Sequence, residues 1–87
     1  MKAIYVCDGY GTIFDLENGL FAYAVNMEDR KAVRYAKSPS YFIRTLRFRK
    51  PKEEDEAYIK ECEQVMKTTD NIILMSGVEQ APDWSKI

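Results

Sequence analysis

The sequence predicts a single α+β domain in which an N-terminal antiparallel β-meander packs against one long amphipathic helix. Two observations indicate this class. Short runs of β-branched and aromatic residues, separated by glycine-containing turns, fill residues 2–25. An apolar stripe at helical spacing, preceded by a run of acids, follows in the second half of the chain. We expect the domain to span residues 1–77 and residues 78–87 to form a C-terminal tail.

Three strands are predicted in the first part of the chain, at residues 2–7, 12–16 and 20–25, because β-branched and aromatic residues dominate each run. A glycine-containing turn separates the first two strands. Asn18 and Gly19 predict a tight hairpin turn before the third strand, since both residue types tolerate positive φ. The three strands should therefore form a meander.

The next two segments each allow two assignments. Residues 27–37 predict a short helix that Asn26 caps, because their apolar residues recur at helical spacing. A strand over residues 31–37 is the alternative. In residues 41–50, apolar residues alternate with arginines, which favours a half-buried strand with the arginines on its solvent face. A second helix that begins at Pro39 is the alternative there.

The strongest helix signal covers residues 52–69. Four consecutive acids near its start favour the positive end of a helix dipole. Apolar side chains at helical spacing form one stripe, which comprises Tyr58, Ile59, Cys62, Val65 and Met66. A short apolar strand is predicted at residues 72–75, and we expect Ile59, Val65 and Ile73 to be buried. The tail is either loose or docked through the single tryptophan of the chain.

Length and composition exclude several classes of protein. The 87 residues are 46% hydrophobic and 31% charged, which is typical of a folded domain rather than a disordered chain. No apolar run is long enough for a membrane helix, and the first residues are unlike a signal peptide, so we expect a cytoplasmic protein. With no histidine and two distant cysteines, we expect no metal, cofactor or disulfide. The missing histidine also favours a non-catalytic protein, since histidine is the commonest general base.

The basic segment, residues 30–52, contains nine of the 13 Lys and Arg residues and no acid, while acids border both of its ends. The net charge of −1 therefore conceals a strongly polarised chain. Cations attract phosphates and aromatic faces stack on unpaired bases, so this composition predicts non-catalytic binding of RNA or another single-stranded nucleic acid. The candidate binding residues are Arg30, Lys31, Arg34, Lys37, Tyr41, Arg44, Arg47, Arg49, Lys50 and Lys52.

Residues 4–16 resemble the first motif of the haloacid dehalogenase superfamily: an apolar strand, Asp8, two residues, Gly-Thr, an apolar pair and a second Asp. The resemblance implies a nucleophilic role for Asp8, and Tyr10 stands where the phosphatase branch has its acid/base Asp. The apolar run at residues 72–75 is similar to the second motif, which would make Ser76 its hydrogen-bonding residue. A truncated hydrolase that uses Asp8 is therefore one alternative function.

In its size and composition, the chain resembles the small accessory proteins with which bacteriophages disable host defences. That resemblance implies an inhibitor of a host factor such as a toxin ribonuclease, in which the basic segment holds RNA and the acidic helix contacts the host protein. An inhibitor that docks its basic face on an acidic host protein, without RNA, is a second alternative. A solvated charged face with no partner is a third. We expect a homodimer, because doubling would extend the cationic surface and bury more apolar area.

Overall fold

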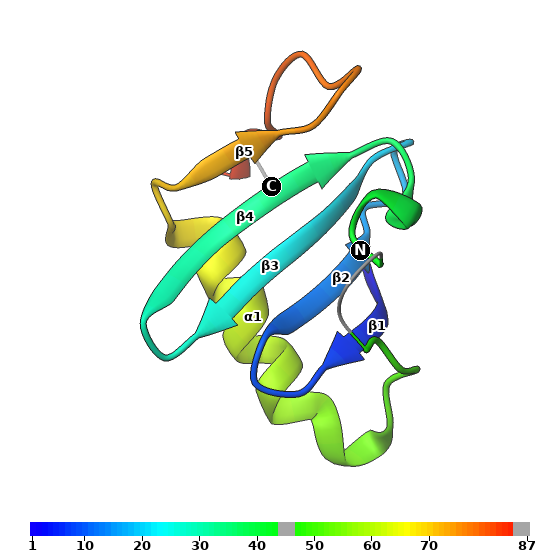
Figure 1. The fold of residues 1–87 in the computed structure, drawn as a ribbon, viewed down its shortest axis with the longest axis vertical. Helices are drawn as coiled ribbons and strands as arrows, with labels where there is room; N and C mark the ends of the chain where they lie inside the picture. Colours follow the sequence, from blue (N-terminus) through cyan, green and yellow to red (C-terminus); the bar gives the residue numbers. More distant parts are fainter. Residues whose placement is uncertain (44–46, 85–87) are drawn as a thin grey trace.

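A computed structural model describes residues 1–43 and 47–84 of the chain. In this part of the chain, five strands form one sheet in the order β1-β2-β3-β4-β5, and a helix lies across it (Figure 1). The strands are β1 (Lys2–Cys7), β2 (Gly11–Asp15), β3 (Phe21–Met27), β4 (Arg30–Ala36) and β5 (Ile72–Leu74). The helix is α1 (Glu56–Thr68), and the 3₁₀ turns are η1 (Pro39–Tyr41) and η2 (Glu53–Asp55).

Strands β1 to β4 form an antiparallel meander, and β5 joins it parallel to β4. A parallel neighbour needs a crossover connection, which the chain makes through η1, η2 and α1. The predicted α+β fold is confirmed, with its N-terminal antiparallel meander, its long helix on the sheet and its short late strand. β1 and β5 are the two edges of this sheet.

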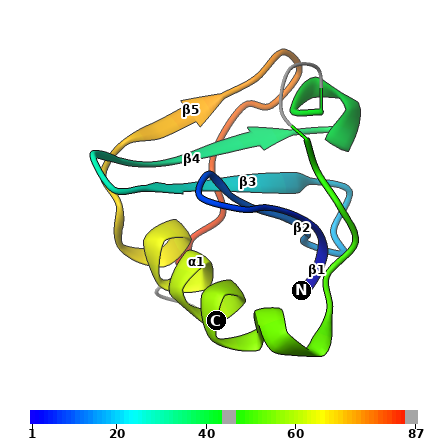
Figure 2. The same ribbon diagram turned by 60° about the horizontal axis from the view of Figure 1, so that its bottom comes forward.

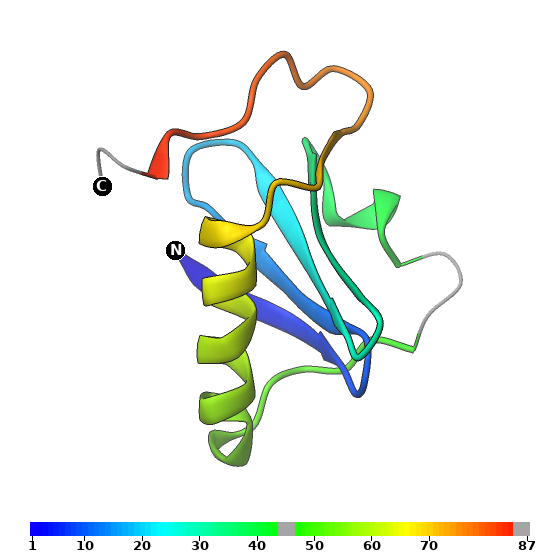
Figure 3. The same ribbon diagram turned by 90° about the vertical axis from the view of Figure 1, so that its left-hand side faces the viewer.

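The sheet carries a hydrophobic core on each of its faces. The first core lies under α1 and contains Phe14, Ala22, Ala24, Val33, Tyr35, Cys62 and Met66. The second core contains Ile13, Tyr23, Val25, Ala32, Ala36 and Phe42. Figure 3 shows the sheet between the two layers, with α1 on one side and η1 on the other. The middle strands are therefore buried on both faces, which gives a small domain two layers of apolar contacts.

The prediction of a helix over residues 27–37 is wrong, and the alternative of a strand there is confirmed, because β4 pairs with β3 along its whole length. Ala32 and Ala36 belong to the core on the face without the helix. Val33 and Tyr35 belong to the core under α1. A strand that is buried on both faces loses the alternation of apolar and polar residues, and its pattern then resembles helical spacing.

The hairpin between β2 and β3 is confirmed, but its turn differs from the predicted one. The Leu16 N–H donates to the Leu20 carbonyl (3.0 Å), so the loop between them has three residues. Positive φ occurs at Glu17 (60°) and Gly19 (90°) and not at Asn18. The Asn18 side chain instead accepts a hydrogen bond from the Leu20 N–H (3.1 Å). Asn18 thus stabilises the loop through its side chain rather than through its backbone conformation.

The strand predicted for residues 41–50 is wrong where the structure describes it. The chain forms η1 after β4 and later runs past β1 on its way to the helix (Figure 2). Residues 44–46 lie outside the described residues. Phe42 and Phe48 both pack on Tyr23, with ring centroids 5.7 and 5.4 Å from the Tyr23 ring. Aromatic packing holds this segment on the sheet, and a single backbone bridge between Arg49 and Val6 takes the place of a full strand.

The predicted long helix is confirmed as η2 followed by α1. Its stripe is less deeply buried than expected. Cys62 and Met66 are fully buried, whereas Ile59 and Val65 are half-buried on the flanks of the stripe. Ile73 is also half-buried, because it lies in an edge strand, so the prediction that these last three residues are buried is wrong in degree.

The chain after β5 returns to the face that carries α1, where Trp84 docks. Its indole Nε1–H donates to the Tyr35 hydroxyl (2.9 Å), and the Lys67 ammonium lies 5.8 Å from the centre of its ring. Val78 and Ala81 pack on the same core. Of the two states predicted for the tail, the described residues adopt the docked one.

Met66→Ala should lower the free energy of unfolding by about 2–5 kcal/mol, because the change leaves a cavity in the core under α1. Gln64→Ala, at an exposed position of the same helix, should change it by less than about 0.5 kcal/mol. Urea unfolding followed by circular dichroism measures both variants. Equal effects of the two substitutions would contradict the placement of Met66 in the core.

Candidate functional site

Arg49 lies at the centre of a charged cluster with Asp8 and Asp55, which we call the Arg49 cluster. Its Nε and Nη2 donate to the two carboxylate oxygens of Asp8 (3.2 and 2.7 Å). Its Nη1 and Nη2 donate to the two oxygens of Asp55 (both 2.8 Å), and Nη1 also donates to the Lys50 carbonyl (3.3 Å). A guanidinium has five N–H donors in a fixed plane, and each of the five has an acceptor here.

Arg49 holds the pKa of both carboxyl groups below the ordinary value. Its hydrogen bonds are the main cause, and they lower the pKa of Asp55 from 3.8 to about 2 and the pKa of Asp8 below 3.8. The Lys52 backbone N–H donates a further hydrogen bond to Asp55 (2.7 Å). Both carboxylates are therefore ionised at neutral pH, and the Arg49 guanidinium has no donor left for a phosphate.

The Arg49 cluster fixes the course of the chain beside β1. Asp8 follows β1 and Asp55 lies in η2, so Arg49 joins the first turn of the sheet to the start of the helix. Val6 and Arg49 exchange two backbone hydrogen bonds (2.7 and 2.8 Å), which place the next residues along the outer edge of β1. Pro51 has no N–H and cannot extend this ladder, so the pairing stops there.

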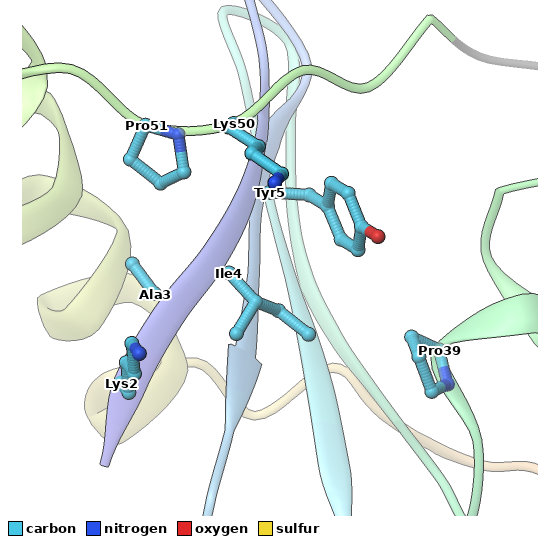
Figure 4. A pocket seen from close by; sticks show the side chains of 7 residues that line it. All are labelled: Lys2, Ala3, Ile4, Tyr5, Pro39, Lys50 and Pro51. Carbon is cyan, nitrogen blue, oxygen red and sulfur yellow. The ribbon is translucent and has the colours of Figure 1, made fainter.

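An open pocket of about 550 Å³ lies beside β1 where this ladder stops, and we call it the β1 pocket. In Figure 4, Lys2 and Lys50 lie toward opposite ends of the pocket, one on β1 and the other on the segment that passes it. A register shift between Ala3 and Tyr5 brings Ile4 and Tyr5 to the same face of the sheet. The described lining residues are Lys2, Ala3, Ile4, Tyr5, Pro39, Lys50 and Pro51.

The described lining of the β1 pocket includes two lysines and no acid. Neither Lys2 nor Lys50 forms an ion pair with another described residue. Tyr5 contributes an aromatic ring, and Ile4 and Pro39 contribute apolar surface. Such a lining suits an anionic ligand that also has a flat apolar part. The pocket volume lies within the range of about 300–1,000 Å³ that is common for ligand sites.

The structure does not gather the basic segment into one surface. Arg30 and Lys31 begin β4, directly after the acidic turn at residues 28–29. Lys37 follows the other end of β4, roughly 20 Å away at about 3.3 Å per residue. Of the ten predicted binding residues, Lys50 alone is among the described residues that line the β1 pocket.

The remaining candidates have different environments from one another. Arg34, in the middle of β4, is half-buried, and its Nε is buried with no hydrogen-bond partner among the described residues. Tyr41, Arg47 and Lys52 are exposed. Arg44 lies outside the described residues. Arg47 and Lys52 are close in sequence to the Lys50–Pro51 wall of the β1 pocket, so they are placed to extend its positive charge.

Asp8 and Ser76, which the dehalogenase resemblance would bring together, lie far apart in the sheet. Asp8 follows β1 at one edge, and Ser76 follows β5 at the other. β5 also runs opposite to β1, so the two residues lie at opposite ends of the strands. Tyr10 is exposed in the turn after Asp8. The described geometry does not assemble the site which that resemblance implies.

The other side chains that could react or bind a metal are buried or lie far from one another. Cys7 and Cys62 are free thiols in the interior, and burial raises the pKa of each, which keeps both protonated. In the described part of the chain, no three His, Cys, Asp or Glu side chains are grouped so that they could hold a metal ion. Within residues 1–43 and 47–84, no helix has the length and apolar character needed to cross a membrane.

Lys2 and Tyr5 were not among the predicted site residues, because they lie outside the basic segment. Their proximity to Lys50 depends on the bridge between Val6 and Arg49, and such long-range pairing leaves no local signal. The alternating pattern of the strand around Tyr5 predicts which face of the sheet its side chain occupies. The pattern does not predict which other segment of the chain lies next to that side chain.

Comparisons of this chain with models of protein families, with curated proteins and with solved structures found no match. Two features of the described structure bear on function, the Arg49 cluster and the β1 pocket. The Arg49 cluster has its donors satisfied and holds the chain in place. The β1 pocket has charges and an aromatic ring that a ligand can reach.

Arg49→Lys should lower the melting temperature, because one ammonium group cannot replace five hydrogen bonds in a fixed planar arrangement. Arg47→Lys is the matched control, since Arg47 is exposed two residues earlier, and it should leave the melting temperature nearly unchanged. Differential scanning calorimetry compares the two variants. A melting temperature that is the same for both would show that the Arg49 cluster does not stabilise the fold.

The stability of the protein should fall in acid between about pH 4 and pH 2. The folded-state pKa of Asp55 is about 2 against an ordinary 3.8, so its contribution is complete above pH 3.8 and is lost as the pH falls through about 2. Asp55→Asn removes this titration and should make the acid-dependent fall shallower. Thermal melts from pH 5 to pH 2 test this, and parallel curves for the two proteins would contradict it.

Proposed function

We propose that this protein binds single-stranded RNA without catalysing a reaction, and that the strand binds at the β1 pocket. One observation carries the proposal: Lys2 and Lys50, from distant parts of the chain, line the same pocket, and its described lining has an aromatic ring and no acid. Phosphates would contact the two ammonium groups, and a base would rest on the ring of Tyr5.

The aromatic ring in the lining of the β1 pocket favours a single strand over a duplex. In a duplex the bases are paired and stacked inside, so an aromatic side chain on a protein surface cannot reach their faces. In a single strand each base has an exposed face, and stacking of one base on an aromatic ring contributes about 1–3 kcal/mol. Tyr5 lies in the wall of the pocket on β1, the strand that also supplies Lys2, so one strand offers both a ring and a charge.

The proposed binding surface differs from the one that the sequence predicted. Arg49 is removed from it, because its five donors are already satisfied. Lys2 and Tyr5 join Lys50 at its centre. Exposed Arg47 and Lys52 extend the positive charge along the chain on either side of Lys50. The net effect is a smaller surface, in which about two phosphates are neutralised at the centre, one by each lysine.

A non-catalytic role agrees with the state of the reactive groups. Asp8 is held by Arg49 with its pKa lowered, which suits a structural carboxylate. Both thiols are buried and protonated. The chain has no histidine to act as a general base at neutral pH. An acidic protein partner is the alternative occupant of the two lysines, and RNA is preferred because it offers both phosphates for the lysines and a flat base for the ring of Tyr5.

The salt dependence of RNA affinity should show whether Lys2 and Lys50 contact phosphates. Each phosphate neutralised on a single strand contributes roughly 0.7 to the slope of log K against log salt, so Lys2→Ala with Lys50→Ala should flatten the slope by about 1.4. The control is Lys31→Ala with Lys60→Ala, which removes the same charge from exposed positions outside the β1 pocket and should alter the slope far less. Fluorescence anisotropy with a labelled oligonucleotide measures both.

Three outcomes are decisive for the pocket lysines. If the Lys2/Lys50 variant alone loses affinity, the β1 pocket is the site. If the Lys31/Lys60 variant loses as much, binding is a diffuse charge effect and the proposed site is wrong. If the unchanged protein binds no RNA in 50 mM salt, where binding driven by phosphate contacts is strong, RNA binding itself is wrong, and an acidic protein partner takes its place as the hypothesis.

Tyr5→Ala should weaken RNA binding by about 1–3 kcal/mol with little change in the salt slope, because stacking involves no counterion release. Tyr10→Ala is the control, since Tyr10 is exposed in the turn after β1 and outside the described lining of the pocket. Circular dichroism of both variants checks that the fold persists. If the Tyr5→Ala protein and the unchanged protein bind RNA with equal affinity, no base stacks on the ring of Tyr5.

A further inference from the structure

β5 forms the edge of the sheet opposite to β1, and in the described chain no strand pairs with its outer side (Figure 1). Ile72 and Leu74 on this strand are 47% and 39% exposed, although both are large apolar residues. An edge that combines unpaired backbone groups with apolar side chains is a template for another strand. The described residues of the chain supply no such strand, so this edge is open to a strand of another molecule.

The backbone of β5 shows which groups point outward. The Val33 N–H donates to the Asn71 carbonyl (3.0 Å), and the Met75 N–H donates to the Tyr35 carbonyl (2.9 Å). In a parallel pair, alternate residues of a strand bond to the same neighbour. Residues 71, 73 and 75 therefore bond toward β4, and Ile72 and Leu74 direct their backbone groups away from the sheet.

We propose that β5 pairs with β5 of a second copy of this chain, antiparallel and about a two-fold axis at Ile73. This register places Ile72 opposite the partner's Leu74, so outward-directed backbone groups meet outward-directed groups. The Leu74 N–H donates to the carbonyl of the partner's Ile72, and symmetry repeats the bond. The Ile72 N–H is already used in a turn with the Asp70 carbonyl (3.1 Å) and is not needed.

The side chains fit the same register. Residues directly opposite each other in an antiparallel pair share a face, so each exposed Ile72 meets an exposed Leu74 of the other copy. Asp70 comes opposite Ser76 of the partner, and Asn71 comes opposite its Met75, so no like charges face each other across the seam. A self-complementary strand of this kind is what a two-fold homodimer requires, because the same patch must serve both subunits.

The dimer would leave the proposed RNA site open. β5 and β1 are opposite edges of the sheet, so pairing through β5 leaves both β1 pockets at the outer edges of a continuous sheet. A three-residue seam is small, and we expect an equilibrium between one and two chains rather than an obligate dimer. The inference does not depend on RNA binding, since it is based on β5 alone.

Dimerisation through β5 should increase with protein concentration and should require the apolar side chain of Leu74. Sedimentation equilibrium from about 10 µM to about 1 mM covers the range of weak interfaces and should show the mass rising from one chain toward two. Leu74→Lys brings a charge against the partner's Ile72 and should abolish the rise. The matched control is Tyr10→Lys, a similar change at an exposed aromatic residue far from β5, which should preserve the rise. A single-chain mass at all concentrations, or a rise that survives Leu74→Lys, would overturn the proposal.

A disulfide tests the register. Ile73 lies on the two-fold axis in a pair without mutual hydrogen bonds, where the two Cα atoms are about 4.5 Å apart, so Ile73→Cys should join two chains under mild oxidation. Leu74→Cys is the control, because the two copies of residue 74 are then roughly 8 Å apart and cannot be bridged. The native thiols are buried and do not compete. Efficient linkage through residue 74 but not residue 73 would show that the register is wrong.

Discussion

The hydrogen bonds of one guanidinium group hold the parts of this domain together. Arg49 joins the turn after β1, through Asp8, to the start of the helical segment, through Asp55. The same residue pairs its backbone with Val6 at the edge of the sheet. These bonds hold the long connection between β4 and α1 in one conformation beside β1. The β1 pocket exists because Arg49 holds the chain beside β1 and Pro51 then prevents further pairing.

The second organising feature is the burial of the sheet on both faces. α1 covers one face, and the aromatic residues Phe42 and Phe48 cover Tyr23 on the other. In a chain of 87 residues a single layer of contacts would give a marginal core, so the second layer adds apolar burial that the domain needs. The segment that supplies this second layer also supplies Lys50, so folding and the proposed binding site depend on the same part of the chain.

Much of the fold could be predicted because the signals are local. The first three strands, the long helix and β5 each follow from the residues they contain. β4 could not be separated from a helix, because a strand buried on both faces shows apolar residues at positions that also suit a helix. The turn at Asn18 was placed correctly, but its geometry depends on which backbone bonds close the loop, and composition does not determine that.

The candidate site was predicted less well, because its geometry is non-local. A run of cations predicts an electrostatic surface, but only the fold shows that Arg49 is satisfied by Asp8 and Asp55. Arg30 and Lys37 were placed on the same surface as Lys50 by sequence proximity, whereas a strand carries them to opposite ends of the sheet. Conversely, Lys2 belongs to the site although the sequence did not predict it, because only the pairing of β1 with the segment at Arg49 brings Lys2 and Lys50 to one pocket.

The most direct test of this account is a nuclear magnetic resonance titration of the protein with a single-stranded RNA of about eight nucleotides, a length typical of single-strand binding sites. If the β1 pocket is the site, the backbone amide signals of residues 2–5 and of Lys50 should shift most and saturate together. Signals of Arg30, Lys31 and the outer face of α1 should move little. Shifts concentrated at the start of β4, or no shifts at all, would contradict the account.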